Sequence, residues 1–231
     1  MIELCRKNLP LKSKYKDVAE KKCYREKDHT GACSEFHYLD DLATNHPRVA
    51  NKIKRDATKT TGAAWKSDDA GPNRIDRWVM LQDDAVLLKY GLNMKALKPT
   101  VIAKLRDKAA TYEACMSVAG KLSWSAYQMP GAPVCPTAIK SYLEKRFGKM
   151  NANSTTCIVC KELISFSLFE KAQRGKAEIE TAHSNPREHN DENVGFAHRE
   201  CNIAQGNKTL DEFYKWIIGI LERAGRIKIT S

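Results

Sequence analysis

The chain has 231 residues, of which 42% are hydrophobic and 29% are charged, and its formal net charge at pH 7 is +11. This composition is typical of a globular protein, and the length suits one large domain or two small ones. No apolar run approaches the roughly 18 to 20 residues that a membrane-spanning helix needs, so the sequence predicts no membrane partner.

The first residues, Met1 to Lys7, lack the apolar stretch of a secretory signal peptide. We therefore expect a cytoplasmic protein, in a prokaryotic cell or a phage-infected host. In that reducing compartment, the eight cysteines indicate metal ligands or free thiols in place of disulfides.

The positive charge is unevenly distributed along the chain. Residues 1–148 carry 27 Lys and Arg against 17 Asp and Glu, whereas residues 149–231 carry 12 against 11. A basic surface attracts polyanions and has sequence-independent affinity for phosphate backbones, although many soluble proteins are basic without such a partner. The charge is consistent with DNA as a partner of 1–148 and does not name that partner alone.

Residues 1–66 are polar and lysine-rich, with weak periodicity. Cys23, His29, Cys33 and His37 lie close together there, but their spacing matches no common zinc module. This favours two free cysteines and two surface histidines over a second zinc site. Three further cysteines have no partner at ligand spacing and are expected to be buried apolar residues: Cys5, Cys115 and Cys135.

The stretch from Asn51 to Gly62 mixes cations with small hydroxyl residues. Such a mixture suits a helix end or loop that lies along a phosphate backbone, and it is equally typical of a solvated surface strip. Residues 66–73 then predict a turn.

Two helices are predicted in the middle of the chain. Apolar residues recur at spacings of three and four from Ile75 to Leu88, and Gly91 ends this pattern. Pro99 opens a second helix whose apolar face extends to Met116. The pair fits a helix-turn-helix loosely and a plain αα-hairpin as well, and we favour the hairpin.

A further helix is predicted from Thr137 to Phe147, and a polar linker follows at 148–154. We interpret this linker as a domain boundary. The sequence then divides into a basic, mainly helical region at 1–148, which we expect to engage DNA, and a second module at 155–231.

The second module has a different pattern. Alternation over 177–183 predicts a strand, a polar loop covers 184–192, and 193–197 is the expected return strand. A helix then begins near His198. A later group of apolar residues recurs at helical spacing and is expected in the core: Phe213, Trp216, Ile217, Ile220 and Leu221.

Four residues form two closely spaced pairs in this module: Cys157 with Cys160, and His198 with Cys201. A C-x₂-C facing an H-x₂-C is typical of a closed tetrahedral zinc site with three thiolates and one imidazole. We therefore predict a structural Zn²⁺ ion bound by these four side chains.

Around the zinc pairs, the segment 155–215 resembles the HNH (ββα-metal) nuclease family. The resemblance is carried by Glu180-Thr181-Ala182-His183, by Asn193, and by His198-Arg199-Glu200-Cys201-Asn202. It implies an α+β protein in which a mainly helical basic N-terminal region precedes a zinc-stapled ββα-metal nuclease module with a C-terminal helix.

Hydrolysis of a phosphodiester needs an activated water and a cation on the phosphate oxygens. His183 is the expected general base, because a neutral imidazole suits that role near pH 7. The resemblance implies that Asn202 helps to hold Mg²⁺ or Mn²⁺ and that Asn193 orients the loop carrying His183.

The sequence departs from the family at Ala182, where many members have an aspartate that binds the metal. Glu180 is our first choice for the missing ligand, and His189 and Asp191 are alternatives. His189 is also an alternative general base.

The sequence therefore predicts a metal-dependent HNH DNA endonuclease of the restriction, homing or phage recombination type. Arg199 and Lys208 are candidates for contacts with the scissile backbone. Because one module would cut one strand, a double-strand break needs a homodimer or two events. The alternative is a zinc-containing protein that binds nucleic acid without catalysis.

Overall fold

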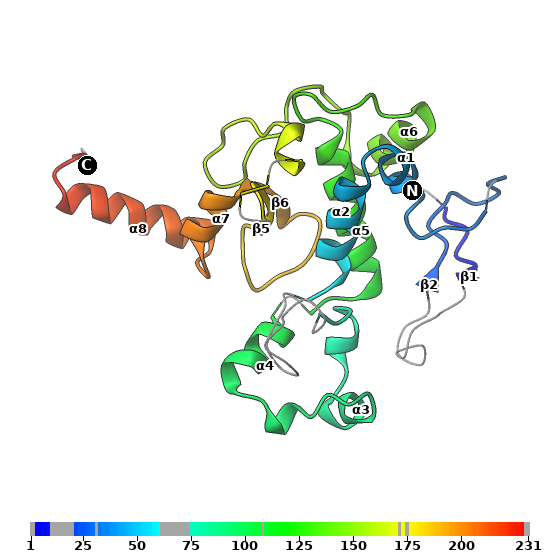
Figure 1. Cartoon of the computed structure of the whole chain (residues 1–231), viewed down its shortest axis with the longest axis horizontal. Coiled ribbons are helices and arrows are strands. Elements are labelled where there is room, and N and C mark those ends of the chain that lie inside the picture. Colours follow the sequence, from blue (N-terminus) through cyan, green and yellow to red (C-terminus); the bar gives the residue numbers. More distant parts are fainter. Residues whose placement is uncertain are drawn as a thin grey trace.

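The computed structural model describes residues 3–9, 21–30, 32–60, 74–107, 109–170, 172–173 and 176–228. The turn predicted at 66–73 lies outside these ranges. The described residues form an α+β fold of helices and three short two-stranded sheets (Figure 1).

Two packed helices, α2 (Pro47–Thr58) and α5 (Tyr112–Ala126), form the centre of the fold. The short elements η1 (His37–Leu39) and α1 (Asp40–Asn45) lead into α2, which begins with a proline in its first turn. Val49, Ala50, Ile53 and Ala57 form the buried stripe of α2. The sequence analysis did not predict α2, because the cations on its opposite face obscure this stripe.

A second group of short elements lies below the body in Figure 1: η2 (Val79–Leu81), α3 (Asp84–Lys89), η3 (Met94–Ala96) and α4 (Pro99–Arg106). The single helix predicted over 75–88 is wrong. Asp83 starts a new helix there, since its carboxylate accepts a hydrogen bond from the Val86 N–H at 2.8 Å.

The helix predicted from Pro99 to Met116 is also wrong, because it is two helices. α4 ends at Arg106, and Thr111 caps the start of α5 by accepting a hydrogen bond from the Ala114 N–H at 3.2 Å. The Arg106 guanidinium turns back to donate to the carbonyl oxygens of Met80 and Gln82, which fixes α4 against η2.

The helix predicted from Thr137 to Phe147 is confirmed as α6 (Thr137–Phe147). The linker after it is tied to α5, since the Gln128 side chain accepts a hydrogen bond from the Asn151 N–H at 2.8 Å. One continuous set of buried apolar side chains includes Leu122 of α5 and Phe196 of the second module. The division into 1–148 and 155–231 stays a prediction, and both ranges contribute to this core.

The C-terminal hairpin follows the predicted order. Strands β5 (Ile179–His183) and β6 (Val194–His198) pair antiparallel, with His183 opposite Val194 and Ile179 opposite His198. Helix α7 (Arg199–Gln205) continues directly from β6, and the element η4 (Phe166–Phe169) precedes the hairpin. Two shorter pairs complete the described strands: β1 (Asn8–Leu9) with β2 (Lys21–Lys22), and β3 (Ala172–Gln173) with β4 (Lys176–Ala177).

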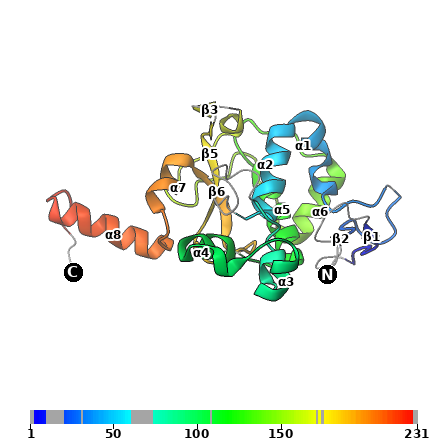
Figure 2. The ribbon, with the colours of Figure 1, turned by 60° about the horizontal axis from the view of Figure 1, so that its bottom comes forward.

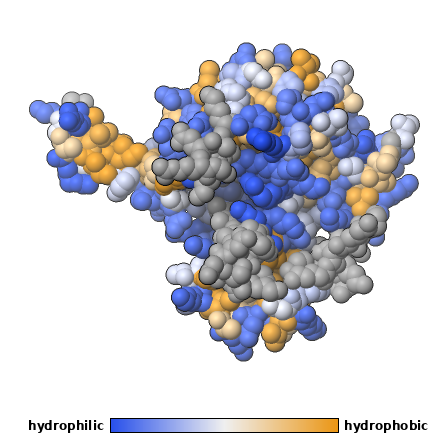
Figure 3. All heavy atoms as spheres, viewed as in Figure 1, coloured by the Kyte–Doolittle hydropathy of each residue, from blue (hydrophilic) through white to orange (hydrophobic). Residues whose placement is uncertain are grey.

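The last helix, α8 (Leu210–Arg223), begins at a capping box of Thr209 and Glu212 and projects from the body in both ribbon views (Figures 1 and 2). Its expected burial is mostly wrong. Phe213 is buried, but Trp216 is 46% exposed and Ile220 is 38% exposed. Figure 3 accordingly shows hydrophobic surface along the projecting helix. None of the described helices is both long and apolar enough to cross a membrane.

Candidate active site and metal cluster

The four predicted zinc ligands of the C-terminal module converge. Their ligand atoms all lie within 4.8 Å of one another, with Cys160 Sγ 3.4 Å and Cys201 Sγ 4.0 Å from His198 Nδ1. With Zn–S bonds of about 2.3 Å and Zn–N bonds of about 2.0–2.1 Å, a tetrahedron has S···S edges of about 3.8 Å and S···N edges of about 3.6 Å. The cluster can therefore hold a metal ion such as zinc.

Local backbone geometry assembles this cluster. The Cys160 N–H points at Cys157 Sγ at 3.4 Å, and Lys161, directly after Cys160, adopts a left-handed φ of 66°. Burial would raise the pKa of the Cys157 thiol, but backbone N–H groups directed at its sulfur, including that of Cys160, lower this pKa overall. A lowered pKa favours the thiolate, which is the form that binds metal.

The cysteine turn, which runs from Cys157 to Lys161, packs directly on the β5–β6 hairpin. The Ile158 N–H donates to the Phe196 carbonyl at 3.0 Å, and a Cβ atom on Gly195 would lie 2.2 Å from Ile158 Cγ2. Only a residue without a side chain fits at 195, so the hairpin and the metal cluster form one packed unit.

A pocket of about 360 Å³ lies between the hairpin, α7 and α2. It brings together the predicted base His183 and the two predicted ligands of the catalytic metal, Glu180 and Asn202. The opposite side carries residues from α2 and from the segment after 73. The remaining lining residues are Arg55, Asp56, Lys59, Arg74, Arg77, Thr181, Ile203, Gly206 and Asn207.

His183 ends β5 and is 5% exposed. Its Nε2 lies 3.0 Å from His189 Nδ1, and His189 Nε2 lies 2.8 Å from the Ala57 carbonyl oxygen of α2. The Gln205 amide, which the sequence analysis missed, donates to the His183 carbonyl at 2.8 Å and ties the strand end to α7. His189 thus holds the imidazole of His183, and Gln205 holds its backbone.

Asn193 lies outside the pocket and binds the loop after His183. Its Oδ1 accepts from the Asn185 N–H at 2.7 Å, and its Nδ2 donates to the carbonyl oxygens of Asn185 and Glu188, each at 2.8 Å. Asp191, one of the alternative metal ligands, accepts instead from Ser117 of α5 at 2.7 Å.

Two carboxylates of the pocket share one lysine. Lys52 Nζ lies 2.9 Å from Asp56 Oδ2 and 3.1 Å from Glu180 Oε2, and Thr181 Oγ1 donates to Asp56 at 3.1 Å. Burial would raise the pKa of Asp56, but the charges of Lys52 and Arg55 outweigh burial and lower it. Asp56 is therefore ionised at neutral pH.

Positive charge dominates the side of the pocket opposite the hairpin: Arg55, Lys59, Arg74 and Arg77. Burial lowers the pKa of Arg77 to about 10, which leaves it charged near neutral pH. Arg55 and Lys59 belong to the basic strip at 51–62 that the sequence singled out. No pattern in the sequence indicated that Asp56 or the arginines at 74 and 77 would face the hairpin.

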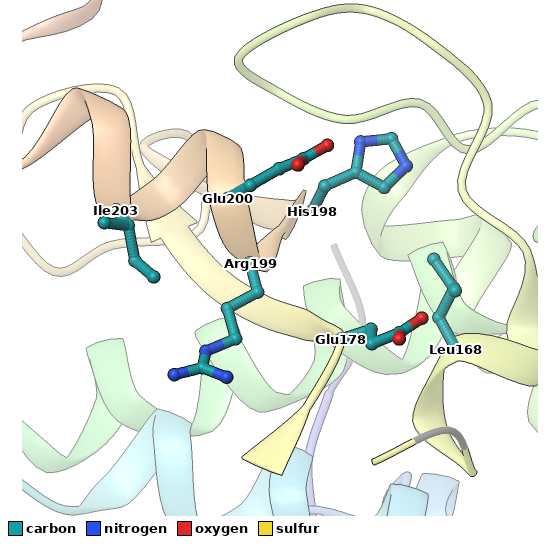
Figure 4. Close-up of a pocket in the computed structure, with 6 residues that line it drawn as sticks. All are labelled: Leu168, Glu178, His198, Arg199, Glu200 and Ile203. Carbon is teal, nitrogen blue, oxygen red and sulfur yellow. The ribbon is translucent and has the colours of Figure 1, made fainter. Parts of the chain in front are cut away.

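A second pocket, of about 460 Å³, lies beside the metal cluster and is shown in Figure 4. Its lining residues are Leu168, Glu178, His198, Arg199, Glu200 and Ile203. Arg199 lines this pocket and not the one with His183, and its guanidinium points away from His198 in Figure 4. Lys208, the other candidate for backbone contact, lies over the Trp216 ring at 4.7 Å.

A comparison with solved structures defines the class of the protein. A structure titled "Crystal structure of a type II restriction endonuclease" is 44% identical in sequence and has a TM-score of 0.85. The match covers 98% of this chain and 100% of that chain. A fold shared over the full length at this identity is that of a restriction endonuclease.

The sequence model of the DraIII family matches residues 35–201, so the chain belongs to the DraIII family of restriction endonucleases. Among curated proteins, no match was found. The matched range includes the metal cluster and both sides of the 360 Å³ pocket apart from its last residues, Asn202 to Asn207.

Proposed function

We propose that this protein is a metal-dependent HNH endonuclease that hydrolyses phosphodiester bonds of DNA. One observation carries the proposal. A hairpin and the helix after it bring a buried histidine, His183, and a helical carboxamide, Asn202, to one pocket whose other side is strongly basic. Membership of a restriction endonuclease family supports DNA as the substrate.

The hydrogen bonds of His183 support its role as general base. A carbonyl oxygen can only accept, so His189 Nε2 carries a hydrogen toward Ala57, and neutral His189 must then accept through Nδ1. His183 donates through Nε2, which leaves the basic lone pair of neutral His183 on Nδ1. His189 is therefore a positioning residue, and Nδ1 of His183, which is buried in this structure, is the atom that we assign as the base once substrate and water enter the pocket.

The donor set of the pocket fits a hard divalent cation. Asn202 and Glu180 supply the amide and carboxylate oxygens expected from the sequence, and Asp56 adds a second carboxylate. Bound there, Mg²⁺ or Mn²⁺ would offset the negative charge of the phosphate oxygens and promote ionisation of the attacking water. Lys52 holds the two carboxylates together and limits their mutual repulsion.

The basic side of the pocket is proposed to bind the DNA backbone. Arg55, Lys59 and Arg74 line the same pocket as His183, where cations suit the charged oxygens of a DNA backbone. Arg55 and Lys59 also pair with Asp56 and Asp76, respectively, each at 2.7 Å. Since this single pocket has one histidine base, each chain would cut one strand. We propose that a homodimer makes the double-strand break.

Cleavage of supercoiled plasmid tests the proposal. We expect nicking and linearisation with Mg²⁺ or Mn²⁺, none with EDTA, and loss of activity in His183→Ala. His46→Ala, which changes a histidine that packs edge-to-face against Phe166 outside the pocket, is the matched control and should cut normally. Equal, metal-insensitive background in wild type and His183→Ala would identify a non-catalytic nucleic-acid-binding protein.

A further inference from the structure

A second group of metal-ligating side chains lies at the other end of the molecule, far along the chain from the hairpin. Cys5, Cys23, His29 and Cys33 place their ligand atoms within 4.8 Å of one another. These residues come from the segment before β1, from the end of β2 and from the loop before η1. Cys23, His29 and Cys33 belong to the group that the sequence singled out and for which free cysteines were favoured, but no spacing rule joins Cys5 to them.

The interatomic distances match a metal tetrahedron. Cys5 Sγ lies 3.9 Å from Cys33 Sγ, and His29 Nε2 lies 3.4 Å from Cys23 Sγ and 3.7 Å from Cys33 Sγ. The edges expected for zinc are about 3.8 Å between sulfurs and about 3.6 Å between sulfur and nitrogen. A disulfide requires about 2.05 Å between sulfurs, and all eight cysteines are free.

The backbone around this cluster repeats features of the C-terminal cluster. Arg6, directly after Cys5, has a left-handed φ of 56°, as Lys161 has directly after Cys160. The Ser34 N–H points at Cys23 Sγ at 3.4 Å, the same distance as from the Cys160 N–H to Cys157 Sγ. An N–H group aimed at sulfur favours the thiolate that a metal needs. Both clusters combine three cysteines with one histidine.

Backbone hydrogen bonds pair the first described residues with the segment 21–27: the Cys5 N–H donates to the Arg25 carbonyl at 2.9 Å, and the Lys27 N–H donates to the Glu3 carbonyl at 2.8 Å. None of the residues 3–9 is buried, and the β1–β2 pair contains two residues in each strand. A two-stranded ribbon of this size is not stable alone. The ribbon contacts the rest of the protein through Leu4, which packs against the core, and through the Lys22 N–H, which donates to the Tyr112 hydroxyl at 3.3 Å. The Arg6 guanidinium lies over the Tyr24 ring at 4.7 Å.

We propose that Cys5, Cys23, His29 and Cys33 bind a second structural zinc ion, which fastens the N-terminal segment to the body of the protein. This corrects two expectations from the sequence. Cys5 is a member of the cluster and not an isolated apolar residue, and His37 is not a member. His37 packs instead against the Tyr142 ring, with 4.3 Å between ring centroids.

The zinc content of the full-length protein tests the proposal. Native mass spectrometry and elemental analysis of wild type should find two zinc ions per chain. Cys5→Ser and His29→Ala should each lower this to one. Cys135→Ser and His37→Gln are the matched controls, because they change a cysteine and a histidine outside both clusters, and they should keep two.

A second measurement uses the wild-type protein alone, so its result does not depend on whether a variant folds. Titration of wild-type thiols with a mercurial reagent, in the presence of a chromogenic chelator, should release two equivalents of zinc. Release of only one equivalent, or two zinc ions retained by both Cys5→Ser and His29→Ala, would overturn the second site.

Discussion

The two sides of the 360 Å³ pocket are built in different ways. The hairpin side takes Glu180, His183 and Asn202 from one stretch of about two dozen residues, where strand, loop and helix follow directly. The basic side comes from α2 and the segment after 73, and the ion pair between Lys52 and Glu180 spans 128 residues. Local structure therefore positions His183, the proposed base, whereas tertiary packing positions the cations proposed to receive the phosphate.

This difference separates two kinds of substitution. On the proposed function, a change on the hairpin side should alter catalysis or the metal cluster that supports the hairpin. A change on the basic side should alter the packing of α2 against the hairpin and the affinity for DNA.

The largest effect is expected from loss of the C-terminal metal cluster. Cys157→Ser should bind one zinc fewer and lose the fold of the hairpin, because structural zinc contributes about 10–16 kcal/mol in small zinc modules and total stability is about 5–15 kcal/mol. Thermal unfolding and zinc analysis measure this. Cys135→Ser is the control, and a Cys157→Ser protein with unchanged zinc content and melting temperature would contradict it.

The next largest loss of stability is expected at Lys52, which contacts carboxylates from both sides of the pocket. Lys52→Met should lower the free energy of unfolding by about 3 kcal/mol, because it removes the cation that Asp56 and Glu180 share and leaves Arg55 as the ion-pair partner of Asp56. Urea denaturation measures the change. Lys104→Met, on the exposed face of α4, should be nearly neutral; equal losses in the two variants would mean that the shared lysine does not join the two sides.

A pH effect of at most about 3 kcal/mol is expected from His37, outside the pocket. Burial lowers its pKa from 6.5 to about 4, with smaller contributions from Arg25, His29 and Arg146. The unfolded chain therefore binds the proton first, so this contribution to stability is complete above pH 6.5 and is lost as the pH falls toward 4.

Denaturation of wild type and His37→Phe at pH 7 and pH 4.5 measures this contribution. The wild type should lose more stability than the variant over that interval. Parallel losses in both proteins would show that His37 does not titrate in this window.

A smaller effect is expected at the contact between the cysteine turn and the hairpin. Gly195→Ala should cost about 1–3 kcal/mol, because the new Cβ would lie 2.2 Å from Ile158 Cγ2. Adding Ile158→Ala removes that methyl group and should restore part of the loss. A Gly195→Ala protein as stable as wild type would mean that the turn can move away from the hairpin.

The sequence predicted the hairpin side well because its signals are local. The zinc pairs at 157, 160, 198 and 201 bracket the strands, and alternation located β5 and β6 to within two residues. The role of each pocket residue stays a prediction, but the structure brings Glu180, His183 and Asn202 together.

The other regions could not be predicted because their determinants are tertiary. In the sequence, Asp56 resembles a surface carboxylate on a cationic helix. In the structure, the hairpin covers it. Asp83 and Thr111 interrupt apolar patterns that otherwise continue, so two predicted helices were placed wrongly. The N-terminal cluster joins Cys5 to residues more than 17 positions away, and no spacing rule connects them.

We propose that the hairpin side catalyses cleavage and that the basic side binds DNA. Measuring DNA affinity and single-turnover cleavage in the same variants tests this most directly. We expect His183→Ala to bind DNA within about threefold of wild type and to cleave at least 100-fold more slowly, since a general base contributes about 10²–10⁴-fold. Arg74→Gln should mainly weaken binding and reduce its salt dependence by about one phosphate contact. Cleavage by His183→Ala at the wild-type rate in Mg²⁺ would contradict the assignment of the pocket as the active site.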